Sequence, residues 1–587
     1  MNISSETFKN LLRRAYFGAK DCRLLRALAR LRALAAIKRR MFEYLQRPRP
    51  RQRQWLQAQI QARRDRYRPK NEPGLLSFIT TVWNTPPEFL KPLAQGLMAQ
   101  AGKLDFEWVL LDNGSTSAAT REALDRIVSR YPAIRFHRVL KNLGIIGGMR
   151  FCLERATGRY ALPLDSDDLL TSDCVSIVTA AIQSLHYPPL LYTDEDKIQQ
   201  DRHLLEFFKN DWDGVFFVHC CFIAHLNAFD RKRALELGVY RDARAEGCHD
   251  WDTFFRFWAA GHTPAHVSEI VYSWRMHEQS CAQNIFSKSY IHDSQRHVLE
   301  QFLRRQDRPD LYRLEYSPLF AGTPDWWILR AHRDERPLLS IVLGDGPLTP
   351  ESIHRSCQYP RHQAIRLHLT ATPADLLPHA KRMAAEGGLI CLASAQVEIL
   401  EPEWPWEALT LMEIFSDTTV VGGRIIEPND LILEAPRVLG FGDGCGCPDR
   451  GRHVGDPGYF ASMWKQHSVS AVSAQFCVMD AAFLLAVLQK ACPPDTSPVM
   501  LGQWAGAWAL RSRRRVVYTP FLRARTRQDW QAMASDDQRR GFLRANRDLM
   551  PDNRYYSHWL SLDEHAPYAP ATPAQRSQHL ERLLAGV

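Results

Sequence analysis

The stretch YALPLDSDDLL, Tyr160–Leu170, decides the fold of this chain. Its apolar run ends in three acids, Asp165, Asp167 and Asp168. An apolar run bounded by polar residues predicts a buried strand, and ligands bind at the carboxyl ends of strands in open α/β sheets. Close carboxylates repel one another, so the cluster indicates either a bound cation, with Mg2+ or Mn2+ suited to oxygen ligands, or an exposed turn that caps the next helix.

Three similar units precede this stretch. A strand over Leu75–Val82 is followed by paired prolines and a helix, and the next strand ends at Asp112 in a DNGS turn that leads into another helix. The third unit carries a turn with Gly144, Gly147 and Gly148. Strand, turn and helix in alternation predict a parallel, doubly wound sheet. We therefore expect Thr81, Asp112 and Asp165 to gather at one edge of that sheet.

This order of motifs resembles the nucleotide-sugar glycosyltransferases of family 2, which have the GT-A fold. The resemblance implies that Asp112 contacts the base of the nucleotide, while Asp165 and Asp167 form a DxD motif that holds the ribose and a metal ion bridging the diphosphate. A divalent ion suits this chemistry because it stabilises the charge that the leaving diphosphate gains. On this basis Thr81, Asp112 and Asp165 are predicted to bind the donor, and Asp167 to bind Mg2+ or Mn2+.

The stretch LLYTDEDKI resembles a segment of the family members that build surface polysaccharides. Its acids are Asp194, Glu195 and Asp196, and a solvated turn is the simpler interpretation, which we favour for Glu195. Asp194 is a candidate for shaping the donor or acceptor pocket.

The stretch AEGCHDWDTFFRFWAAG places Asp250 and Asp252 at the start of an amphipathic helix, where acids also serve as caps. Family members have an acid here that acts as general base, and Asp250 is the residue that matches. An inverting transfer needs one carboxylate to take the acceptor hydroxyl proton as that hydroxyl attacks the anomeric carbon. We predict that Asp250 is this base and that Asp252 has a structural role.

The stretch IVYSWRMHEQS resembles the family's WRxHxxS segment near the donor diphosphate. Arg275 is predicted to pair with phosphate oxygens, although an arginine at a strand edge is also an ordinary surface residue. His277 is predicted as a further metal ligand, with a hydrogen-bonded structural histidine as the alternative.

From Arg336 the pattern of elements starts again, which indicates an internal repeat. The acids are missing from this copy: Ala393–Gln396 stand where the DxD motif is expected, and Gln503 lies near the place of the base. We expect a catalytically silent copy that serves acceptor binding or assembly. Trp404, Trp406, Trp464 and Trp504 either form a sugar-stacking surface or belong to the core.

Residues 1–70 hold 20 Lys and Arg against 4 Asp and Glu, so the rest of the chain carries −6 of the overall +10 charge. Helical spacing of apolar residues predicts a basic amphipathic arm with a second helical piece around Trp55, Leu56 and Ile60. Such an arm binds an anionic membrane surface or packs on the protein's own body or a twin chain, so an oligomer is possible. Nucleic acid is not an expected partner because no binding module appears elsewhere.

Thirteen cysteines without a CxxC pair indicate a reducing compartment, and no apolar run is long enough to span a bilayer. We therefore predict an α/β chain with a basic arm (1–70), a catalytic GT-A domain (71–330), a degenerate GT-A-like domain (331–560) and a tail (561–587). The expected function is inverting transfer from a nucleotide diphosphate sugar to a polysaccharide or lipid-linked oligosaccharide, at the cytoplasmic face of the plasma membrane. The alternatives are a two-site polymerase and a non-catalytic carbohydrate-binding scaffold.

Overall fold

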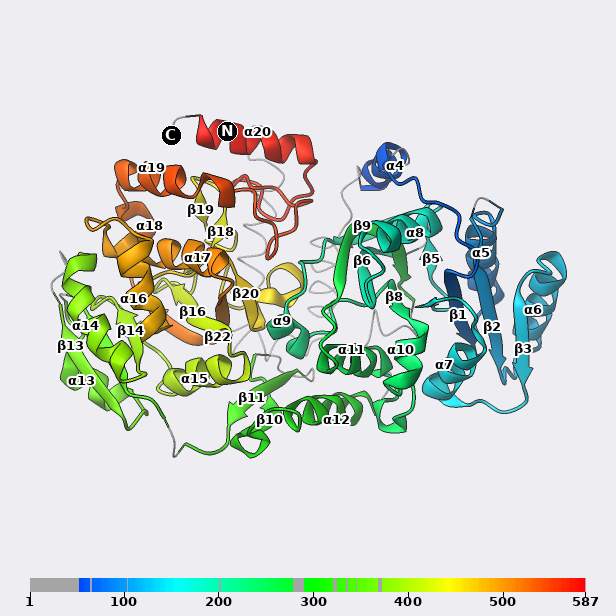
Figure 1. Ribbon diagram of the computed structural model, residues 1–587, viewed down its shortest axis with the longest axis horizontal. Coiled ribbons are helices and arrows are strands. Elements are labelled where there is room, and N and C mark those ends of the chain that lie inside the picture. Colours follow the sequence, from blue (N-terminus) through cyan, green and yellow to red (C-terminus); the bar gives the residue numbers. More distant parts are fainter. Residues whose placement is uncertain are drawn as a thin grey trace, which may run out of the picture.

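The computed structural model describes residues 52–585, apart from 64–65, 103, 200–201, 278–289, 320–324, 334–335, 345 and 368–371. Two large sheets with flanking helices lie side by side along the long axis (Figure 1). One is built from strands between residues 76 and 275, and the other from strands between residues 339 and 525. The predicted α/β fold with two sheet-bearing domains is confirmed.

The first sheet has the strand order β3-β2-β1-β4-β8-β6-β9-β5, with β7 paired to β6. Strands β1 to β4 run parallel, as the alternation predicts, and β8 runs antiparallel between β4 and β6. Their apolar runs are buried because helices cover them. The strands are β1 (Leu76–Val82), β2 (Glu107–Asn113), β3 (Arg135–Val139), β4 (Tyr160–Pro163), β5 (Leu169–Leu170), β6 (Leu190–Gln199), β7 (Arg202–Phe207), β8 (Asn227–Asp230) and β9 (Ala265–Arg275).

The helices of this half begin where the strands end. The three glycines predicted as a turn instead lie inside helix α7, and Gly148 lets this helix approach the sheet: a Cβ there would lie 2.7 Å from Thr81 Cγ2. The helices are α5 (Pro87–Met98), α6 (Ala118–Arg130), α7 (Gly144–Arg155), α8 (Cys174–Ser184), α9 (Gly214–His219), α10 (Arg231–Glu236), α11 (His249–Ala259) and α12 (Ile291–Leu303).

The second sheet has the order β13-β12-β14-β21-β16-β22-β15, with β17 paired to β16 and β20 to β22. It matches the first sheet from β2 to β5 strand by strand, and each matched pair is parallel or antiparallel as in the first sheet. The repeat seen in the order of sequence elements is therefore a repeat of topology. The strands are β12 (Leu339–Leu343), β13 (His362–Arg366), β14 (Leu389–Ala393), β15 (Glu398–Ile399), β16 (Thr418–Ile426), β17 (Ile432–Glu434), β20 (His467–Val469), β21 (Phe476–Asp480) and β22 (Arg515–Arg525).

Helices of the second half cover this sheet and reach the carboxyl terminus (Figure 1). A hairpin of β10 (Tyr312–Tyr316) and β11 (Trp326–Arg330) joins the two halves, and β18 (Val438–Leu439) pairs with β19 (Cys445–Gly446). The helices are α13 (Pro350–Ser356), α14 (Pro373–Ala385), α15 (Trp404–Ile414), α16 (Ala481–Lys490), α17 (Leu501–Arg511), α18 (Trp530–Met533), α19 (Asp536–Ala545) and α20 (Pro573–Leu584).

Buried polar contacts join the two halves. The Asp213 carboxylate accepts hydrogen bonds from the Ser468 backbone amide at 2.7 Å and from Arg515 Nη1 at 3.1 Å. The Lys465 ammonium donates to the His219 carbonyl at 2.9 Å. The Asp213 carboxylate is 1% exposed, so separating the halves would take away its partners from the second half.

The predicted second helical piece of the arm is helix α4, Gln52–Arg63, which packs on the protein's own body. Arg63 is 1% exposed and pairs with Asp173 at 2.7 Å and Glu269 at 3.2 Å. The rest of the helical arm predicted before it lies outside the described residues. None of the helices in the described part of the chain has the length and apolar character needed to cross a bilayer.

Candidate functional site

Three of the predicted donor-binding residues lie at one edge of the first sheet. Val82 of β1 pairs with Asp112 of β2, and Ile79 of β1 pairs with Pro163 of β4, so the ends of these parallel strands are adjacent. The DNGS turn after β2 requires glycine at Gly114, where φ is +76° and a Cβ would lie 2.6 Å from a backbone nitrogen. The structure therefore places Thr81, Asp112 and Asp165 at the same edge of the sheet, as the sequence predicts.

Asp112 is buried and its carboxylate has two partners. Oδ1 accepts from the Ser115 amide at 3.0 Å, and Oδ2 accepts from Arg138 Nε at 2.7 Å. Trp83 follows β1 beside this turn and is 57% exposed. Neither Arg138 nor Trp83 is among the residues predicted from the sequence. A tryptophan directly after a strand end was the available signal, since an exposed aromatic ring at a ligand-binding edge can stack on a planar ligand.

The second predicted cluster is also brought together. His277 Nε2 lies 2.8 Å from Asp167 Oδ2, and Arg275 Nε donates to the Asp167 carbonyl at 2.6 Å. Asp168 differs from its neighbours because it is buried and accepts hydrogen bonds from the Arg275 amide at 2.7 Å and the Tyr272 hydroxyl at 2.5 Å. Asp168 thus fixes the end of β9 against the acidic loop, which leaves Asp165 and Asp167 to face solvent.

Asp250 lies in the first turn of α11 as predicted, and this helix begins without a side-chain cap. Its Oδ1 is 3.4 Å from His249 Nε2, whereas Asp252 forms a buried ion pair with Arg256 at 2.7 Å. The Asp165 side chain is 55% exposed, and its Oδ2 lies 3.9 Å from His225 Nε2. Asp167 and Asp250 lie close enough to act on Asp165 as like charges, while His225 opposes them.

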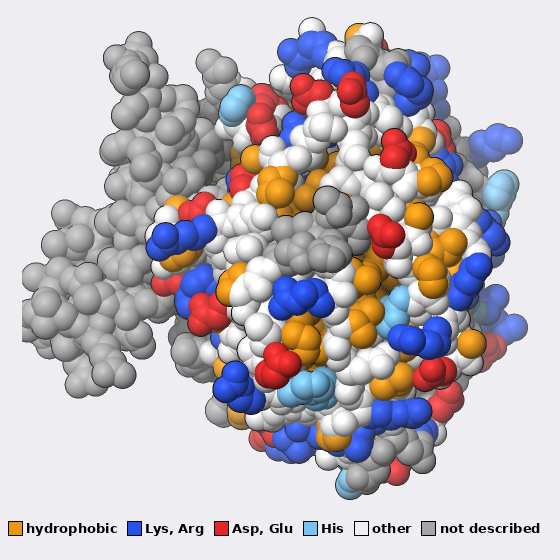
Figure 2. Space-filling view, turned by 90° about the vertical axis from the view of Figure 1, so that its left-hand side faces the viewer, with side chains coloured by type: hydrophobic (Ala, Val, Ile, Leu, Met, Phe, Trp, Pro, Cys, Tyr) orange, Lys and Arg blue, Asp and Glu red, His pale blue; other side chains and the backbone are white. Residues whose placement is uncertain are grey.

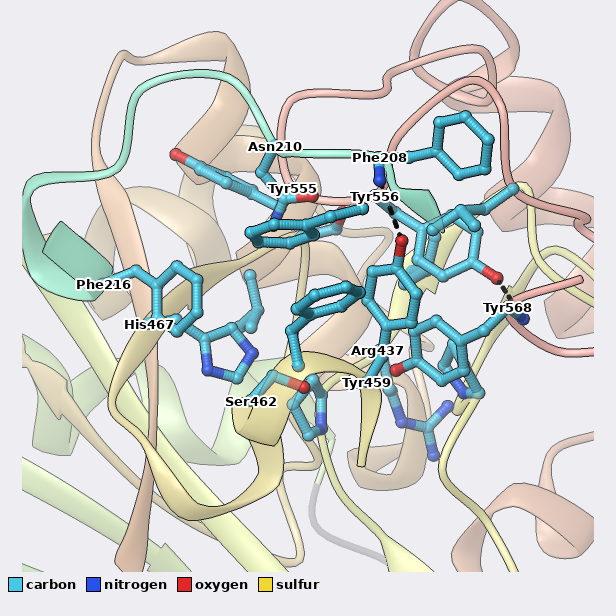
Figure 3. A pocket seen from close by; sticks show the side chains of 18 residues that line it. Phe208, Asn210, Phe216, Arg437, Tyr459, Ser462, His467, Tyr555, Tyr556 and Tyr568 are labelled. Carbon is cyan, nitrogen blue, oxygen red and sulfur yellow. Dashed lines mark hydrogen bonds between the residues drawn. The ribbon is translucent and has the colours of Figure 1, made fainter. Parts of the chain in front are cut away.

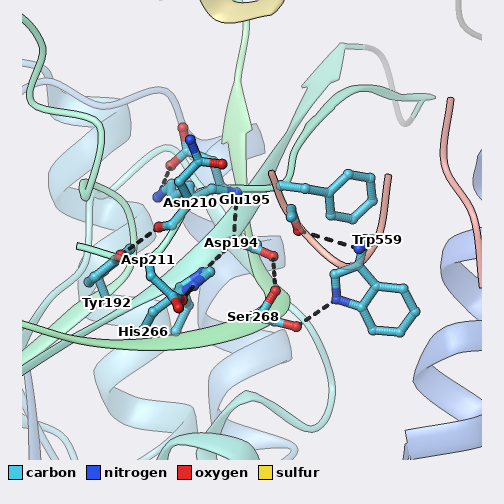
Figure 4. A network of polar contacts seen from close by, with 12 residues as sticks. Tyr192, Asp194, Glu195, Asn210, Asp211, His266, Ser268 and Trp559 are labelled. Carbon is cyan, nitrogen blue, oxygen red and sulfur yellow. Dashed lines mark hydrogen bonds and ion pairs between the residues drawn. The ribbon is translucent and has the colours of Figure 1, made fainter. Parts of the chain in front are cut away.

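The interpretation of the TDED stretch as a solvated turn is wrong. Asp194, Glu195 and Asp196 lie within strand β6 and are buried. Asp194 Oδ1 accepts from His266 Nε2 at 2.8 Å, and the other ring nitrogen of His266 lies 3.0 Å from Asp211 (Figure 4). These acids are buried because each has a cationic or hydrogen-bonding partner that the sequence pattern does not reveal.

The donor set at Asp167 is compatible with a divalent cation. An oxygen and a nitrogen donor, Asp167 Oδ2 and His277 Nε2, lie together, and both side chains are partly exposed. Within the described ranges no cluster of three or more His, Cys, Asp and Glu side chains is arranged as a metal site. An ion held here would therefore take further ligands from a bound diphosphate or water, as Mg2+ and Mn2+ commonly do.

The second sheet has lost this chemistry. Matching the short strands β5 and β15 places Ser394, Ala395, Gln396 and Val397 at the positions of Asp165 to Asp168, one residue later than the sequence comparison suggested. An apolar cavity of about 60 Å³ lies at this edge. It is lined by Val342, Leu343, Leu392, Ala393, Ser394 and Trp530, among others. No carboxylate among its lining residues replaces those of the first sheet.

Of the two interpretations of the tryptophans, the core holds for three of the four. Trp404, Trp406 and Trp504 are buried core residues, and Trp464 is half-buried. Aromatic side chains instead gather between the two halves around a cavity of about 50 Å³ (Figure 3). They include Phe207, Phe208, Phe216, Tyr459, Phe460, Tyr555, Tyr556 and Tyr568.

Comparisons with known proteins find a family similarity in the first half. Residues 77–231 match the family described as "Glycosyl transferase family 2", a segment that holds the strand ends with Thr81, Asp112, Asp165 and Asp167. The chain is 26% identical over 443 residues to "Uncharacterized protein y4gI" of Sinorhizobium fredii, covering 69% of this chain and 48% of that protein. It is 22% identical over 403 residues to "O-antigen biosynthesis protein RfbC" of Myxococcus xanthus, covering 64% and 31%. The matched segments thus span about half or less of these relatives.

Solved structures give weaker similarity. S. aureus TarS 1–349 has a TM-score of 0.30 at 15% identity, covering 39% of this chain and 71% of that chain. Its complex with UDP-GlcNAc has a TM-score of 0.32 at 15% identity, covering 39% and 66%. Because both scores lie below 0.5, this likeness has no bearing on the assignment.

Proposed function

We propose that this chain, which carries a glycosyl transferase family 2 domain at residues 77–231, moves a sugar from a nucleoside diphosphate donor to a glycan or lipid-linked acceptor with inversion. The observation that carries the proposal is the gathering of Asp165 and Asp167 with Arg275 and His277 at the ligand edge of the sheet, with Asp250 in the first turn of α11 as a further, partly exposed acid. Separate acids of this kind suit donor binding and proton transfer. A scaffold protein, the alternative of another class, has no need for them.

Each residue is assigned one step. Trp83 stacks on the nucleobase. The polar edge of the base hydrogen-bonds to the Asp112 carboxylate, which also accepts from Arg138, and Thr81 lies at the same strand end. Asp165 binds the ribose side, and Arg275, beside the Asp167 carbonyl, binds the diphosphate. Asp167 and His277 would hold Mg2+ or Mn2+, which when bound stabilises the charge on the departing diphosphate.

Asp250 supplies the proton transfer. Its carboxylate takes the proton of the acceptor hydroxyl as that oxygen attacks the anomeric carbon from the face opposite the diphosphate. Asp252 is excluded from this role because Arg256 holds it.

We propose that the chain consists of a catalytic domain at 71–330, a second domain at 331–560 and a tail at 561–587. The second domain is proposed to be catalytically silent. Its lost acids and apolar cavity support this over a two-site polymerase. The double variant Asp167→Ala with Asp250→Ala tests it. We expect no sugar-specific transfer, and substantial residual transfer would establish a second working site.

The acceptor and location follow from resemblance and charge. The O-antigen relative supports a surface-polysaccharide acceptor. We propose that the basic arm before α4 holds the chain to an anionic membrane at its cytoplasmic face. On the face shown in Figure 2, basic, acidic and hydrophobic side chains are interspersed. Sedimentation with anionic and neutral vesicles tests this, and equal binding to both would contradict it.

The proposed activity is tested with a panel of nucleotide sugars, following release of the diphosphate with Mn2+, with Mg2+ and with EDTA. We expect one donor class to react and EDTA to abolish the reaction. Calorimetric titration with UDP, GDP, CDP and dTDP in the presence of Mn2+ gives an independent readout. Failure of all four to bind would overturn the enzyme assignment.

A further inference from the structure

The His225 imidazole, which has no role in the proposed transfer, lies between two acids. His225 Nε2 lies 3.9 Å from Asp165 Oδ2, and its Nδ1 lies 3.4 Å from Glu195 Oε2. The ring stacks on Tyr272 with centroids 5.1 Å apart and planes at 14°. Tyr272 in turn holds Asp168. His225 therefore contacts the acidic loop directly and also through Tyr272.

Buried charges hold this histidine in place. The Lys209 ammonium donates to the His225 carbonyl at 2.8 Å and lies 3.4 Å from Glu195 Oε2, which also accepts from the His225 amide at 2.5 Å. Burial alone would lower the pKa of His225, but Glu195, Asp165 and Asp250 raise it to about 10. The lowered pKa of Glu195, where Lys209 and His225 outweigh burial, agrees with an ionised partner. The ring is thus a cation at neutral pH.

The segment that carries Lys209, residues 206–209, contacts the second half of the chain. The Tyr459 hydroxyl accepts from the Phe208 amide at 3.0 Å (Figure 3). It also donates to the Glu206 carbonyl at 3.2 Å. The Phe460 ring stacks on Phe207 at 3.7 Å. Phe460 adopts a left-handed φ of +48°, a conformation that needs support from its surroundings.

We propose that His225 is a positioning residue of the transfer site, which orients Asp165 for the donor, and that Tyr459 of the second half fixes it through the Lys209 segment. This inference rests on the proposed function and deepens it. It gives the second half a role, because the Tyr459 hydroxyl of that half makes two hydrogen bonds to the segment that carries Lys209. Lys209 in turn contacts Glu195 and His225. It also explains why Glu195 is buried in β6 rather than solvated.

The first test compares His225→Phe, which keeps the ring stacked on Tyr272, with His225→Gln, which keeps polar groups without the charge. UDP, GDP, CDP and dTDP are titrated into the full chain with Mn2+. For the nucleotide that binds, we expect His225→Phe to weaken affinity about tenfold or more, the effect of one charge-assisted contact. Donor KM should rise by a similar factor while kcat changes less than about threefold. Unchanged affinity and KM in either folded variant would overturn the proposal.

The second test compares Tyr459→Phe with Tyr568→Phe. The Tyr568 hydroxyl also makes a buried hydrogen bond, but to Asp449 within the second half. We expect donor KM to rise about threefold or more in Tyr459→Phe only. Equal values in the two variants would refute the role of the second half.

The two levels of the proposal fail differently. If the natural chain binds none of the four nucleotides, the proposed function is wrong. If it binds one and the His225 variants bind it equally well, only the positioning role is wrong. Thermal unfolding of each variant shows that it is folded, and His225→Gln decides if His225→Phe does not fold.

Discussion

Replacing Asp250 by Asn removes the proton acceptor while keeping the shape of the side chain. The Asp250 carboxylate is partly exposed, lies in the first turn of α11 and makes no capping bond, so the fold loses little. General base catalysis contributes about 10²- to 10⁴-fold to a rate. We therefore expect kcat to fall by at least about 100-fold, or about 2.7 kcal/mol at 1.36 kcal/mol for each factor of ten.

The assay follows release of the nucleoside diphosphate at saturating donor and acceptor. Donor affinity should stay within about threefold, because Asp250 is assigned to the acceptor. Asp252→Asn is the matched control: it breaks the buried pair with Arg256, so we expect stability to fall by about 1–3 kcal/mol with kcat retained. If Asp250→Asn keeps more than about a third of kcat, or if Asp252→Asn loses as much, the assignment of the base is refuted.

Three further predictions concern stability. Gly148→Ala places a Cβ 2.7 Å from Thr81 Cγ2 and 2.8 Å from Asn113 Nδ2, so urea unfolding should show a loss of about 1–3 kcal/mol, whereas Gly96→Ala in α5, with its nearest neighbour at 4.0 Å, should lose nothing. Arg63→Leu leaves Asp173 and Glu269 buried without their cation and should lower the free energy of unfolding by about 3–5 kcal/mol. The Arg66 side chain is 49% exposed, so Arg66→Leu should lower it by less than about 1 kcal/mol. Similar losses in the two variants would contradict the docking of α4. Burial raises the pKa of Glu407 in the folded chain, despite its hydrogen bonds to Thr519, Trp327 and Gln466. As the pH rises, the unfolded chain therefore releases this proton before the folded chain does. The free energy of unfolding should fall between the ordinary pKa of a glutamate and the raised pKa of Glu407. Glu407→Gln should flatten that slope in thermal melts, and an unchanged slope would show that other groups cause it.

The sequence was sufficient for features that depend on local pattern. Apolar runs ending in acids predicted strands β2 and β4, and an apolar run before a polar turn predicted β1. Together they placed Thr81, Asp112 and Asp165 at one edge, because parallel strands end together. The start of α11 at His249 was also predictable from its periodicity. The pairing of Asp167 with His277 followed only from the family resemblance, since 110 residues separate them.

The features that failed depend on long-range partners. Asp194 and Glu195 read as a solvated turn because acids are seldom buried, yet His266 and Lys209 pair with them from other strands and loops. His225 gave no periodic signal, and its position follows from the Glu195 carboxylate that accepts its amide. The tryptophans of the second half were ambiguous because a large aromatic side chain serves a core or a binding surface equally well.

The repeat explains how one copy could lose its site and keep its fold. In the first sheet Asp168 and Tyr272 form a buried hydrogen-bonded pair, and the matched strand registers place Val397 and Ala524 at their positions in the second sheet. Losing one partner alone would leave a buried polar group unpaired, whereas replacing both by apolar groups costs little. Asp165, Asp167 and Asp250 differ from such pairs because they are exposed or partly exposed, so the fold does not need them. Their clustering in the first half is therefore better explained by chemistry than by stability. In the second half, which lacks these acids, the corresponding edge of the sheet is apolar.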